Sequence, residues 1–534
     1  MRYIVTYNNN ISLIEQVYKP QSYTIIGGQY VILYYEQESE FLDIEDSAYP
    51  KCYGLAQADV LEATGINELR QVTGLNLYGN GVTVGIIDDG FDLRAEALRN
   101  ADGSSKFYAY YNQVTGVSLN ENDINTVLEQ GDSEVVPENF SDAENTQHGT
   151  MLAGIICGEG NNQGFTGVAP NVSMIGVALR RAEPSMYEHY NIDESIKAYS
   201  EADILEGIDY ITRMAGASPL IILLPFETNL GSHTGRGILE EYSNWITEQL
   251  HRAVFVPAGN QAVSKAHTSG SVFNSLGETG EMKEVAFLVN EDRTNTFMNI
   301  VMSQGTRPIV MIESPTGELR RVTGEVGDFE FVFEGSQVQV KINEYDNRSE
   351  KCMVYIRCNN LTRGIWKVFL QVENEGRVVD YDCYLPIDTF SRGEVEFLSP
   401  VAENTVTSPG DAMLSCTVGS YDSETNKIYP PSGKGNINIK PEFCAPGVNV
   451  LSYNTVSENF STFSGTSVAG AVTAGAAALV MQWAAVLGNG PFITGTGLKQ
   501  LLITGCMPMS SYVPDGQWGY GALNVYGSFE AIRE

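Results

Sequence analysis

The chain has 534 residues, 43% of them hydrophobic, a length that allows about three domains with sizeable cores. It carries 66 acidic and 32 basic residues, a net charge of −34. This charge argues against nucleic acid and anionic membrane surfaces as partners, because both require basic patches, whereas basic substrates remain compatible with it.

Residues 1–48 form a small unit in which strands and a helix alternate. The pattern predicts strands at 3–7, 23–26 and 30–35 and a helix over 11–17. The first seven residues lack the apolar segment of a signal peptide, so the sequence leaves the localisation unassigned.

Residues 49–271 show apolar strands separated by helices. Strands are predicted at 82–87, 173–179, 220–224 and 253–256, and helices at 195–214 and 237–251. Near-continuous apolar strands with helices between them are typical of a parallel sheet that is covered on both faces. This part therefore predicts an α/β fold.

Residues 272–405 have a different sequence pattern, in which short strands alternate with turn signals. The strands are predicted at 285–289, 308–312, 329–333, 337–340 and 352–356. This pattern predicts an inserted all-β domain, an antiparallel sandwich or jelly roll.

The α/β pattern resumes over residues 406–534. Residues 469–488 are apolar enough to suggest a membrane span, but their many Ala and Gly residues favour a helix buried in a large domain. Eight scattered cysteines without a C-x-x-C pair predict reduced thiols. No acidic cluster has EF-hand spacing, and we predict neither a metal site nor a cofactor.

Three motifs in the α/β parts carry the side chains that acyl transfer needs. Asp88 ends an apolar strand in Ile-Ile-Asp-Asp-Gly, His148 opens a helix in His-Gly-Thr-Met, and Ser467 follows Gly-Thr in Ser-Gly-Thr-Ser. A serine hydroxyl becomes a strong nucleophile only when a base removes its proton. His148 can be that base, and Asp88 can fix its tautomer. Taken singly, each motif has an ordinary structural interpretation: the Asp88 motif as a turn, the His148 motif as a helix start and the Ser467 motif as a loop.

Asp, His and Ser in this order resemble the motifs of the subtilisin-like serine proteases, the subtilases. The resemblance implies that Asp88, His148 and Ser467 are catalytic. The segment Phe-Val-Pro-Ala-Gly-Asn that ends at Asn260 is similar to the one that supplies an oxyanion donor in this family. Losing such an amide costs about 3 to 4 kcal/mol of barrier, a value that comes from subtilisin itself.

The resemblance also gives residues 1–48 a role. In subtilases this position is held by a propeptide, which assists folding and then blocks the active site. The resemblance implies a cut between about residues 47 and 56, and the alternative is an ordinary N-terminal subdomain. The own N-terminal propeptide and a protein or peptide substrate are the expected partners, with no nucleic acid and no membrane.

Residues 364–368, 384–386 and 518–521 resemble the clostridial Csp-type germination proteases, subtilases with a jelly-roll insert. This implies a subtilisin-like parallel sheet covered by helices, with an α+β propeptide-like domain and an inserted jelly roll. The expected domains are 1–48, 49–271, 272–405 and 406–534, the second and fourth forming the catalytic domain. Processing of a precursor such as a spore-cortex hydrolase, in the cytoplasm or the spore, is implied as well.

Two features depart from the common subtilase pattern. Pro225-Phe226-Glu227 stands where many subtilases have Ser-x-Gly, on the strand that pairs with the substrate. Pro225 lacks an N–H, although its carbonyl can still accept a hydrogen bond. Asp89 is similar to the second Asp of kexin- and furin-like subtilases, which faces a basic substrate residue. Asp89 and Glu227 motivate the hypothesis of cleavage next to Lys or Arg; alternatively, Glu227 faces solvent and Asp89 caps a turn.

Three functions remain open from the sequence. The first is an active serine endopeptidase that acts through an acyl-enzyme on Ser467. The second is a catalytically silent pseudoprotease that binds or signals in spore germination. The third assigns carbohydrate or protein binding to the insert, although fold alone does not establish such a role.

Overall fold

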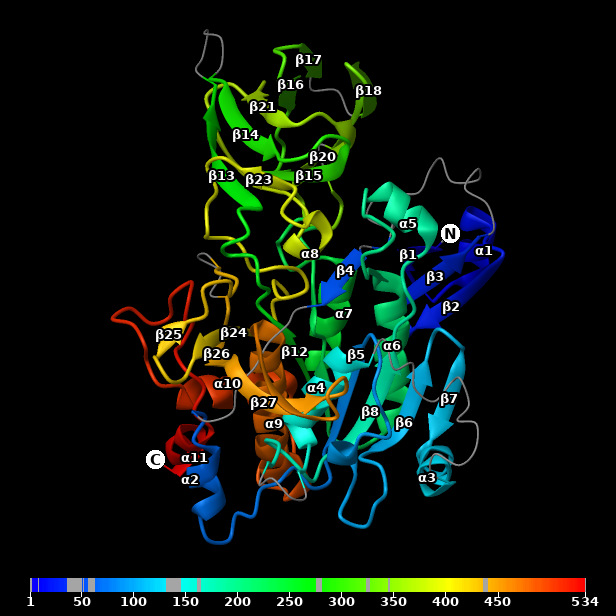
Figure 1. Cartoon of the computed structure of the whole chain (residues 1–534), viewed down its shortest axis with the longest axis vertical. Helices are drawn as coiled ribbons and strands as arrows, with labels where there is room; N and C mark the ends of the chain where they lie inside the picture. The colour runs from blue at the N-terminus through cyan, green and yellow to red at the C-terminus, as the bar shows by residue number, and fades with distance from the viewer. Residues whose placement is uncertain are drawn as a thin grey trace.

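The structure is a computed structural model of the chain. It describes residues 2–7, 9–35, 50, 52–55, 63–130, 146–160, 165–274, 281–322, 327–343, 346–435 and 440–533. An α/β body, an all-β domain at one end of it and a small N-terminal unit at its side make up the molecule (Figure 1). Most of the predicted cleavage region, residues 47–56, lies outside the described residues, apart from Pro50 and the backbone of 52–55.

A nine-stranded sheet forms the centre of the α/β body, in the order β25-β24-β12-β10-β5-β8-β6-β7, with β26 paired to β24. All its pairs are parallel except β6 with β7 and β24 with β25. The strands are β5 (Thr83–Asp88), β6 (Phe107–Asn112), β7 (Val117–Asn120), β8 (Ser173–Ala178), β10 (Leu220–Leu223), β12 (Arg252–Pro257), β24 (Cys416–Asp422), β25 (Lys427–Ile428) and β26 (Phe443–Pro446).

Helices cover both faces of this sheet, because successive side chains of a strand point to opposite faces. On β10, Ile221 and Leu223 join the core with α4 (Gln147–Cys157) and α9 (Thr466–Met481). Leu220 and Ile222 join the core with α6 (Glu201–Ala215) and α7 (Ile238–Thr247). The parallel sheet predicted from four apolar strands is therefore present.

The α9 helix continues into a π-helix, Gln482–Val486, and lies inside the body. Together they are long and apolar enough to cross a membrane, yet 89% of the most apolar window is buried. Gly475 permits this packing, since a Cβ there would lie 2.6 Å from the Cβ of Val168. This burial is the position predicted for residues 469–488.

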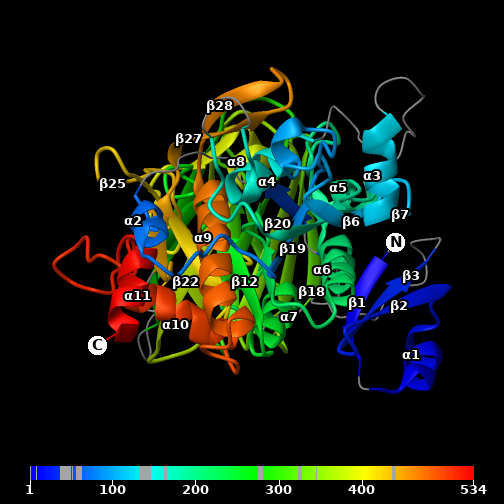
Figure 2. The ribbon, with the colours of Figure 1, turned by 90° about the horizontal axis from the view of Figure 1, so that it is seen from below.

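The other helices lie at the margins of the body or in the insert (Figures 1 and 2). They are α2 (Ile66–Gln71), a 3-10 helix (Glu96–Leu98), α3 (Glu121–Gln130), α5 (Pro184–His189), α8 (Asp388–Ser391), α10 (Gly495–Gly505) and α11 (Val525–Arg533). A two-stranded sheet, β27 (Val448–Asn454) with β28 (Asn459–Ser464), leads into α9.

Two predicted helix boundaries were wrong: the helix expected to reach residue 251 ends at Thr247, and another helix begins later than predicted. The helix expected from residue 195 begins at Glu201, because the Ser200 hydroxyl accepts a hydrogen bond from the Ala202 N–H and caps it there. Tyr199 and Ser200 instead form a short strand, β9. The corrected boundary places an extended segment beside the catalytic candidates.

The N-terminal unit has the predicted elements: β1 (Arg2–Thr6), α1 (Ile11–Tyr18), β2 (Ser22–Ile26) and β3 (Tyr30–Tyr34), in an antiparallel sheet of order β1-β3-β2. Alternate side chains again divide between two cores. Ile4 and Ile32 pack on the side of α6, whereas Val5 and Leu33 pack with Ile14 of α1. The unit therefore lies on α6, on the side of the body away from α10 and α11 (Figure 2).

The insert consists of two antiparallel sheets, ordered β13-β22-β15-β20-β19-β18 and β17-β16-β21-β14-β23, around one core. Its strands are β13 (His267–Phe273), β14 (Lys283–Val289), β15 (Thr294–Met302), β16 (Pro308–Glu313), β17 (Leu319–Val322), β18 (Gly327–Phe333), β19 (Ser336–Asn343), β20 (Cys352–Leu361), β21 (Gly364–Val372), β22 (Val378–Tyr384) and β23 (Val395–Phe397). The boundary predicted at 272 lies inside β13, which pairs with β22 along its whole length.

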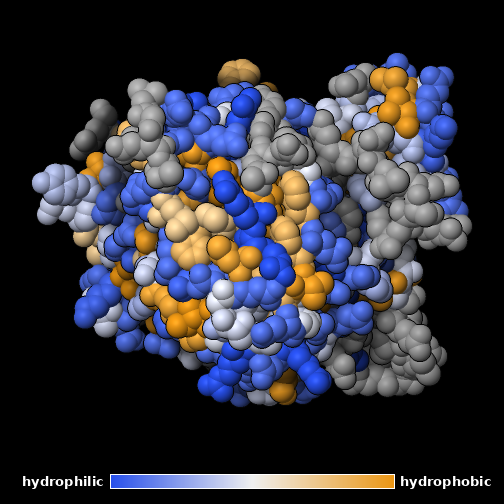
Figure 3. Space-filling view, turned by 90° about the horizontal axis from the view of Figure 1, so that it is seen from above, coloured by the Kyte–Doolittle hydropathy of each residue, from blue (hydrophilic) through white to orange (hydrophobic). Residues whose placement is uncertain are grey.

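Figure 3 views the outer end of this domain, where hydrophobic and hydrophilic side chains are interspersed. Exposed hydrophobic side chains include Leu319, Val332 and Ile365. The four-part division and the binding role of the insert stay predictions. The seven cysteines whose side chains are described are all free thiols.

Candidate active site

Asp88 and His148 form a buried pair at the carboxyl end of β5. The Nδ1 atom of His148 lies 2.8 Å from Oδ2 and 3.0 Å from Oδ1 of Asp88. Asp88 is fully buried and His148 is 7% exposed. The carboxylate is also fixed by the Asp89 N–H, which donates to Oδ1 over 2.8 Å. This arrangement leaves the Nε2 side of the imidazole for proton transfer.

Gly149 allows the pair to form. Its position in the first turn of α4 faces the loop after β5, and a Cβ there would lie 2.3 Å from the Gly90 carbonyl oxygen. The same Cβ would lie 3.0 Å from the Cβ of Asp88. Only glycine lets the helix start this close to the end of the strand, which brings His148 within reach of Asp88.

Ser467 is the second residue of α9 and is fully buried. Because it belongs to the first turn of the helix, its backbone N–H has no acceptor within the helix. Gly465, with a φ of 150°, turns the chain from β28 into α9. Helices α4 and α9 pack against each other, so the first turns that carry His148 and Ser467 belong to neighbouring helices.

Asn260 follows β12 and is tied to the residue before Ser467. Its Oδ1 atom accepts hydrogen bonds from the Thr466 N–H over 3.0 Å and from the Thr466 hydroxyl over 3.2 Å. Because the oxygen is held in this way, the amide nitrogen points elsewhere and can donate to another acceptor. The Asn260 side chain is thus hydrogen-bonded to the residue directly before Ser467, which relates its N–H₂ group to the backbone N–H of Ser467.

Glu227 supports this loop through two hydrogen bonds. Its Oε2 accepts from the Asn260 N–H over 2.7 Å, and its Oε1 accepts from the Gln261 side chain over 3.0 Å. The carboxyl is only 2% exposed. Burial raises its pKa to about 7, although the hydrogen bonds from Asn260 and Gln261 oppose that rise. Glu227 therefore neither faces solvent nor presents a free carboxylate to a ligand.

Asp89 is the other predicted substrate-binding acid, and it is paired. Its Oδ2 lies 2.6 Å from the Nζ of Lys197. Burial, together with the neighbouring Asp88 carboxylate, raises the pKa of Asp89 to about 7. Pro225, the third residue of this prediction, is buried directly before β11 (Phe226–Glu227).

A short strand of the chain itself crosses this region. β4 (Cys52–Leu55) is the middle strand of a three-stranded antiparallel sheet, with β11 on one side and β9 on the other. Leu55 pairs with Phe226 and Gly54 with Glu227, whereas Cys52 pairs with Ser200. We call β4 the resident strand. It lies in extended form beside the residue that supports Asn260.

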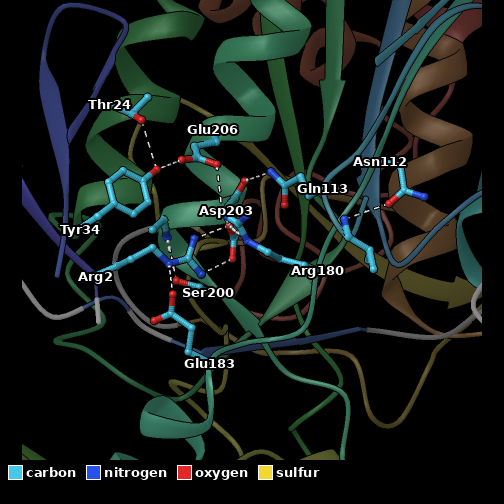
Figure 4. Close-up of polar contacts among 12 residues, drawn as sticks. Arg2, Thr24, Tyr34, Asn112, Gln113, Arg180, Glu183, Ser200, Asp203 and Glu206 are labelled. Carbon is cyan, nitrogen blue, oxygen red and sulfur yellow. Dashed lines mark hydrogen bonds and ion pairs between the residues drawn. The ribbon is translucent and has the colours of Figure 1, made fainter. Parts of the chain in front are cut away.

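The N-terminal unit is fixed to α6 by a buried ionic network (Figure 4). Arg2 of β1 donates to both oxygens of Asp203, which is fully buried, and its Nε lies 2.7 Å from Oε1 of Glu183. Arg180 donates to the same Asp203 over 2.8 Å. Asp203 is thus held between two guanidinium groups, one from the N-terminal unit and one from the body.

Sequence reasoning did not find three of these features: the bonds of Glu227 to the Asn260 loop, the pairing of Lys197 with Asp89, and the place of the resident strand. Glu227 and Asp89 were noted as unusual, but their partners lie 33 and 108 residues away along the chain. Among the residues with described side chains, no group of three or more His, Cys, Asp or Glu could hold a metal ion.

The sequence and the fold of the chain are similar to those of known proteins. The model of the subtilase family (peptidase S8) matches residues 79–276 and 389–521, and the gap between them falls in the inserted domain. The structure of the CspB protease of Clostridium perfringens is similar, with a TM-score of 0.78 and 26% identity over 88% of this chain and 96% of that one.

Two further proteins are similar over smaller or more distant parts. Serine protease AprX of Bacillus subtilis (strain 168) is 30% identical over 146 residues, 23% of this chain and 31% of AprX, so the chain spans about a third of that relative. Fervidolysin of Fervidobacterium pennivorans, with a TM-score of 0.51 and 12% identity over 99% of this chain and 60% of that one, shares the fold.

The support of the Asn260 loop can be tested by exchanging two side chains. Glu227→Gln replaces one acceptor oxygen by an N–H₂ group, which cannot accept a hydrogen bond from Asn260 or Gln261. We expect this loss to displace Asn260. We expect kcat to fall by roughly tenfold or more with little change in KM, because oxyanion donors act in the transition state. Steady-state kinetics with a fluorogenic peptide on processed protein would measure this.

The matched control is the double variant Glu227→Gln, Gln261→Glu. It restores one acceptor for each donor and should recover most of kcat, because the amide introduced at position 227 then donates to the new carboxylate at position 261. Equal kcat for the single variant and the wild type would contradict the role of Glu227, as would a double variant no better than the single one.

Glu227 also gives stability a pH dependence. Its pKa lies near 4.5 in the unfolded chain and near 7 in the folded one, so the folded state binds the proton more tightly. Its contribution to stability is therefore complete below about pH 4.5 and is lost as the pH rises through 7. Compared with Glu227→Gln, the wild type should lose stability over this window, as urea unfolding midpoints would show. Parallel pH curves for the two proteins would rule this out.

Proposed function

Because the chain belongs to the subtilase family, we propose that it is a serine endopeptidase that cleaves peptide bonds through an acyl-enzyme on Ser467. The observation that carries the proposal is the resident strand, held as a peptide substrate would be between two antiparallel strands at the site. The Asp88–His148 pair at 2.8 Å and the tethered Asn260 amide support it.

The proposed reaction uses each of these groups once in each half. His148 takes the proton of the Ser467 hydroxyl while its oxygen attacks the peptide carbonyl carbon. The oxyanion accepts hydrogen bonds from the Asn260 amide and the Ser467 N–H. His148 then protonates the departing amine, and the acyl-enzyme forms. In the second half, His148 deprotonates a water that attacks the ester, and Ser467 regains its proton.

Asp88 fixes the tautomer of His148 during the proton-transfer steps. Its carboxylate accepts from the Nδ1–H of His148, which leaves Nε2 as the base and stabilises the imidazolium formed in both halves. Its burial matters because a solvated carboxylate would stabilise the cation less.

The resident strand also supports the propeptide interpretation of the N-terminal part. Residues 52–55 occupy the place of a substrate, and the unit before them docks on α6, so this part of the chain blocks the site in cis. Because the resident strand ends at Leu55, we expect cleavage just after it, with a new N-terminus at Ala56 or Gln57.

The substrate class is a second part of the proposal. A precursor protein as substrate and a spore-associated setting are what the resemblance to the Csp-type germination proteases implies, and the similarity to the CspB protease supports that resemblance. The predicted preference for basic residues stays a prediction. Its physical basis has changed, however, because Asp89 and Glu227 already hold partners from within the chain.

The endopeptidase proposal can be tested by mass spectrometry and active-site labelling together. We expect the purified wild type to show a new N-terminus at Ala56 or Gln57 and to react with a fluorophosphonate. Ser467→Ala should abolish both, since the nucleophile is lost. Processed wild-type protein that neither reacts nor cleaves peptides would instead support a silent binding module.

The ionic network predicts that the N-terminal unit stays bound after cleavage. Removing Arg2 leaves the buried Asp203 with Arg180 as its guanidinium partner and takes the cation away from Glu183, so Arg2→Met should weaken retention by roughly tenfold or more. Lys19→Met, which removes an exposed cation of the same unit, is the matched control. Size-exclusion chromatography of processed protein measures the co-eluting fragment, and equal retention in both variants would contradict the prediction.

A further inference from the structure

A cation of the chain itself sits at the carboxylate next to the catalytic pair. The Nζ of Lys197 lies 2.6 Å from Oδ2 of Asp89, whose side chain is almost fully buried. The other oxygen, Oδ1, is buried and has no hydrogen-bond partner among the described residues. Asp89 is therefore a carboxylate that depends on one ammonium group.

The position of this pair can be related to the three-stranded sheet that contains the resident strand, which we call the groove. Tyr53 pairs with Tyr199 and Cys52 with Ser200 in an antiparallel register. Strand β9 begins at Tyr199, and extending its register by the two residues before it brings Lys197 level with Leu55, the last residue of the resident strand. Leu55 pairs on its other side with Phe226. By this extension, Lys197 lies level with the substrate position that Leu55 represents.

We propose that Lys197 is a specificity-determining residue, because its ammonium group fills a cation subsite that Asp89 would otherwise offer to the substrate. The inference rests on the proposed endopeptidase function and deepens it. The protease then disfavours Lys and Arg at the substrate position matching Leu55 and accepts an uncharged side chain there, which restricts the predicted preference for basic residues to other positions.

Electrostatics support this assignment. Asp89 lies beside the Asp88 carboxylate, and a second negative charge in a buried site needs a nearby cation to remain ionised. Lys197 provides that cation from a side chain that is 43% exposed, at the boundary of the groove. A substrate cation would meet Lys197 first, and like charges in contact are unfavourable.

Peptide turnover tests the proposal directly. A set of fluorogenic peptides carries Arg or Leu in turn at each of the four positions before the scissile bond. In the wild type, Arg should lower kcat/KM at the position matching Leu55. In Lys197→Met, the ratio of kcat/KM for Arg over Leu at that position should rise roughly tenfold or more.

Two variants separate the charge from the shape of Lys197. Lys197→Arg keeps the cation and should keep the wild-type ratio. Adding Asp89→Asn to Lys197→Met removes the buried acid and should return the ratio toward the wild-type value. An unchanged ratio in Lys197→Met, with peptides still cleaved, would overturn the proposal while leaving the endopeptidase function intact.

A second measurement does not depend on catalysis. In the Ser467→Ala background, Leu55→Arg places a cation in the resident strand, and thermal unfolding reports how well it is accepted. Leu55→Arg should lower the unfolding midpoint by about 2 °C or more when Lys197 is present, and by less when Lys197→Met is added. Equal changes in the unfolding midpoint with and without Lys197→Met would overturn the proposed role of Lys197. If no variant cleaves any peptide, the proposed function fails, and this coupling still decides the role of Lys197.

Discussion

The parallel direction of the central strands is the constraint on which the candidate site depends. Strands β5 and β12 run the same way, so Asp88 and the Asn260 loop emerge at one edge of the sheet. Helices α4 and α9 cover the same face and pack together, and each carries its functional residue in its first turn. Side chains that are far apart in the sequence are thereby held on rigid strands and helices, so few flexible bonds remain that could displace them.

The neighbourhood of the site shows how a chain with a net charge of −34 accommodates buried acids. Each carboxylate has a different partner: Asp88 an imidazole, Asp89 an ammonium group and Glu227 two N–H donors. A buried carboxylate without such a partner takes up a proton or weakens the fold. Each acid near Ser467 therefore holds its own partner in place, and the three do not act as one negatively charged patch.

The sequence predicted those features that depend on local pattern. Among the residues that the structure describes, alternation and apolar runs located the three strands of the N-terminal unit, four of the nine strands of the central sheet and five of the eleven strands of the insert, because burial on one or two faces leaves a periodic signature. Asp88 and His148 were predicted from their motifs, and the structure places them in contact. Features that depend on long-range contacts left no such signature. The partner of Glu227 and the place of residues 52–55 required the fold itself, since a two-residue strand such as β11 has too short a pattern to be recognised.

The two attachments of the N-terminal part differ in kind, and this difference bears on regulation. The resident strand contributes main-chain pairing over a few residues, whereas the N-terminal sheet buries apolar side chains and Arg2 against α6. The proposed cut after Leu55 or Ala56 would break a covalent link but remove neither attachment. A docked unit keeps its tethered strand at high effective concentration beside the groove, so a substrate must compete with a neighbour that rebinds quickly. Under the proposed function, release of the N-terminal unit from α6 would therefore govern access to Ser467, and the cut alone would not.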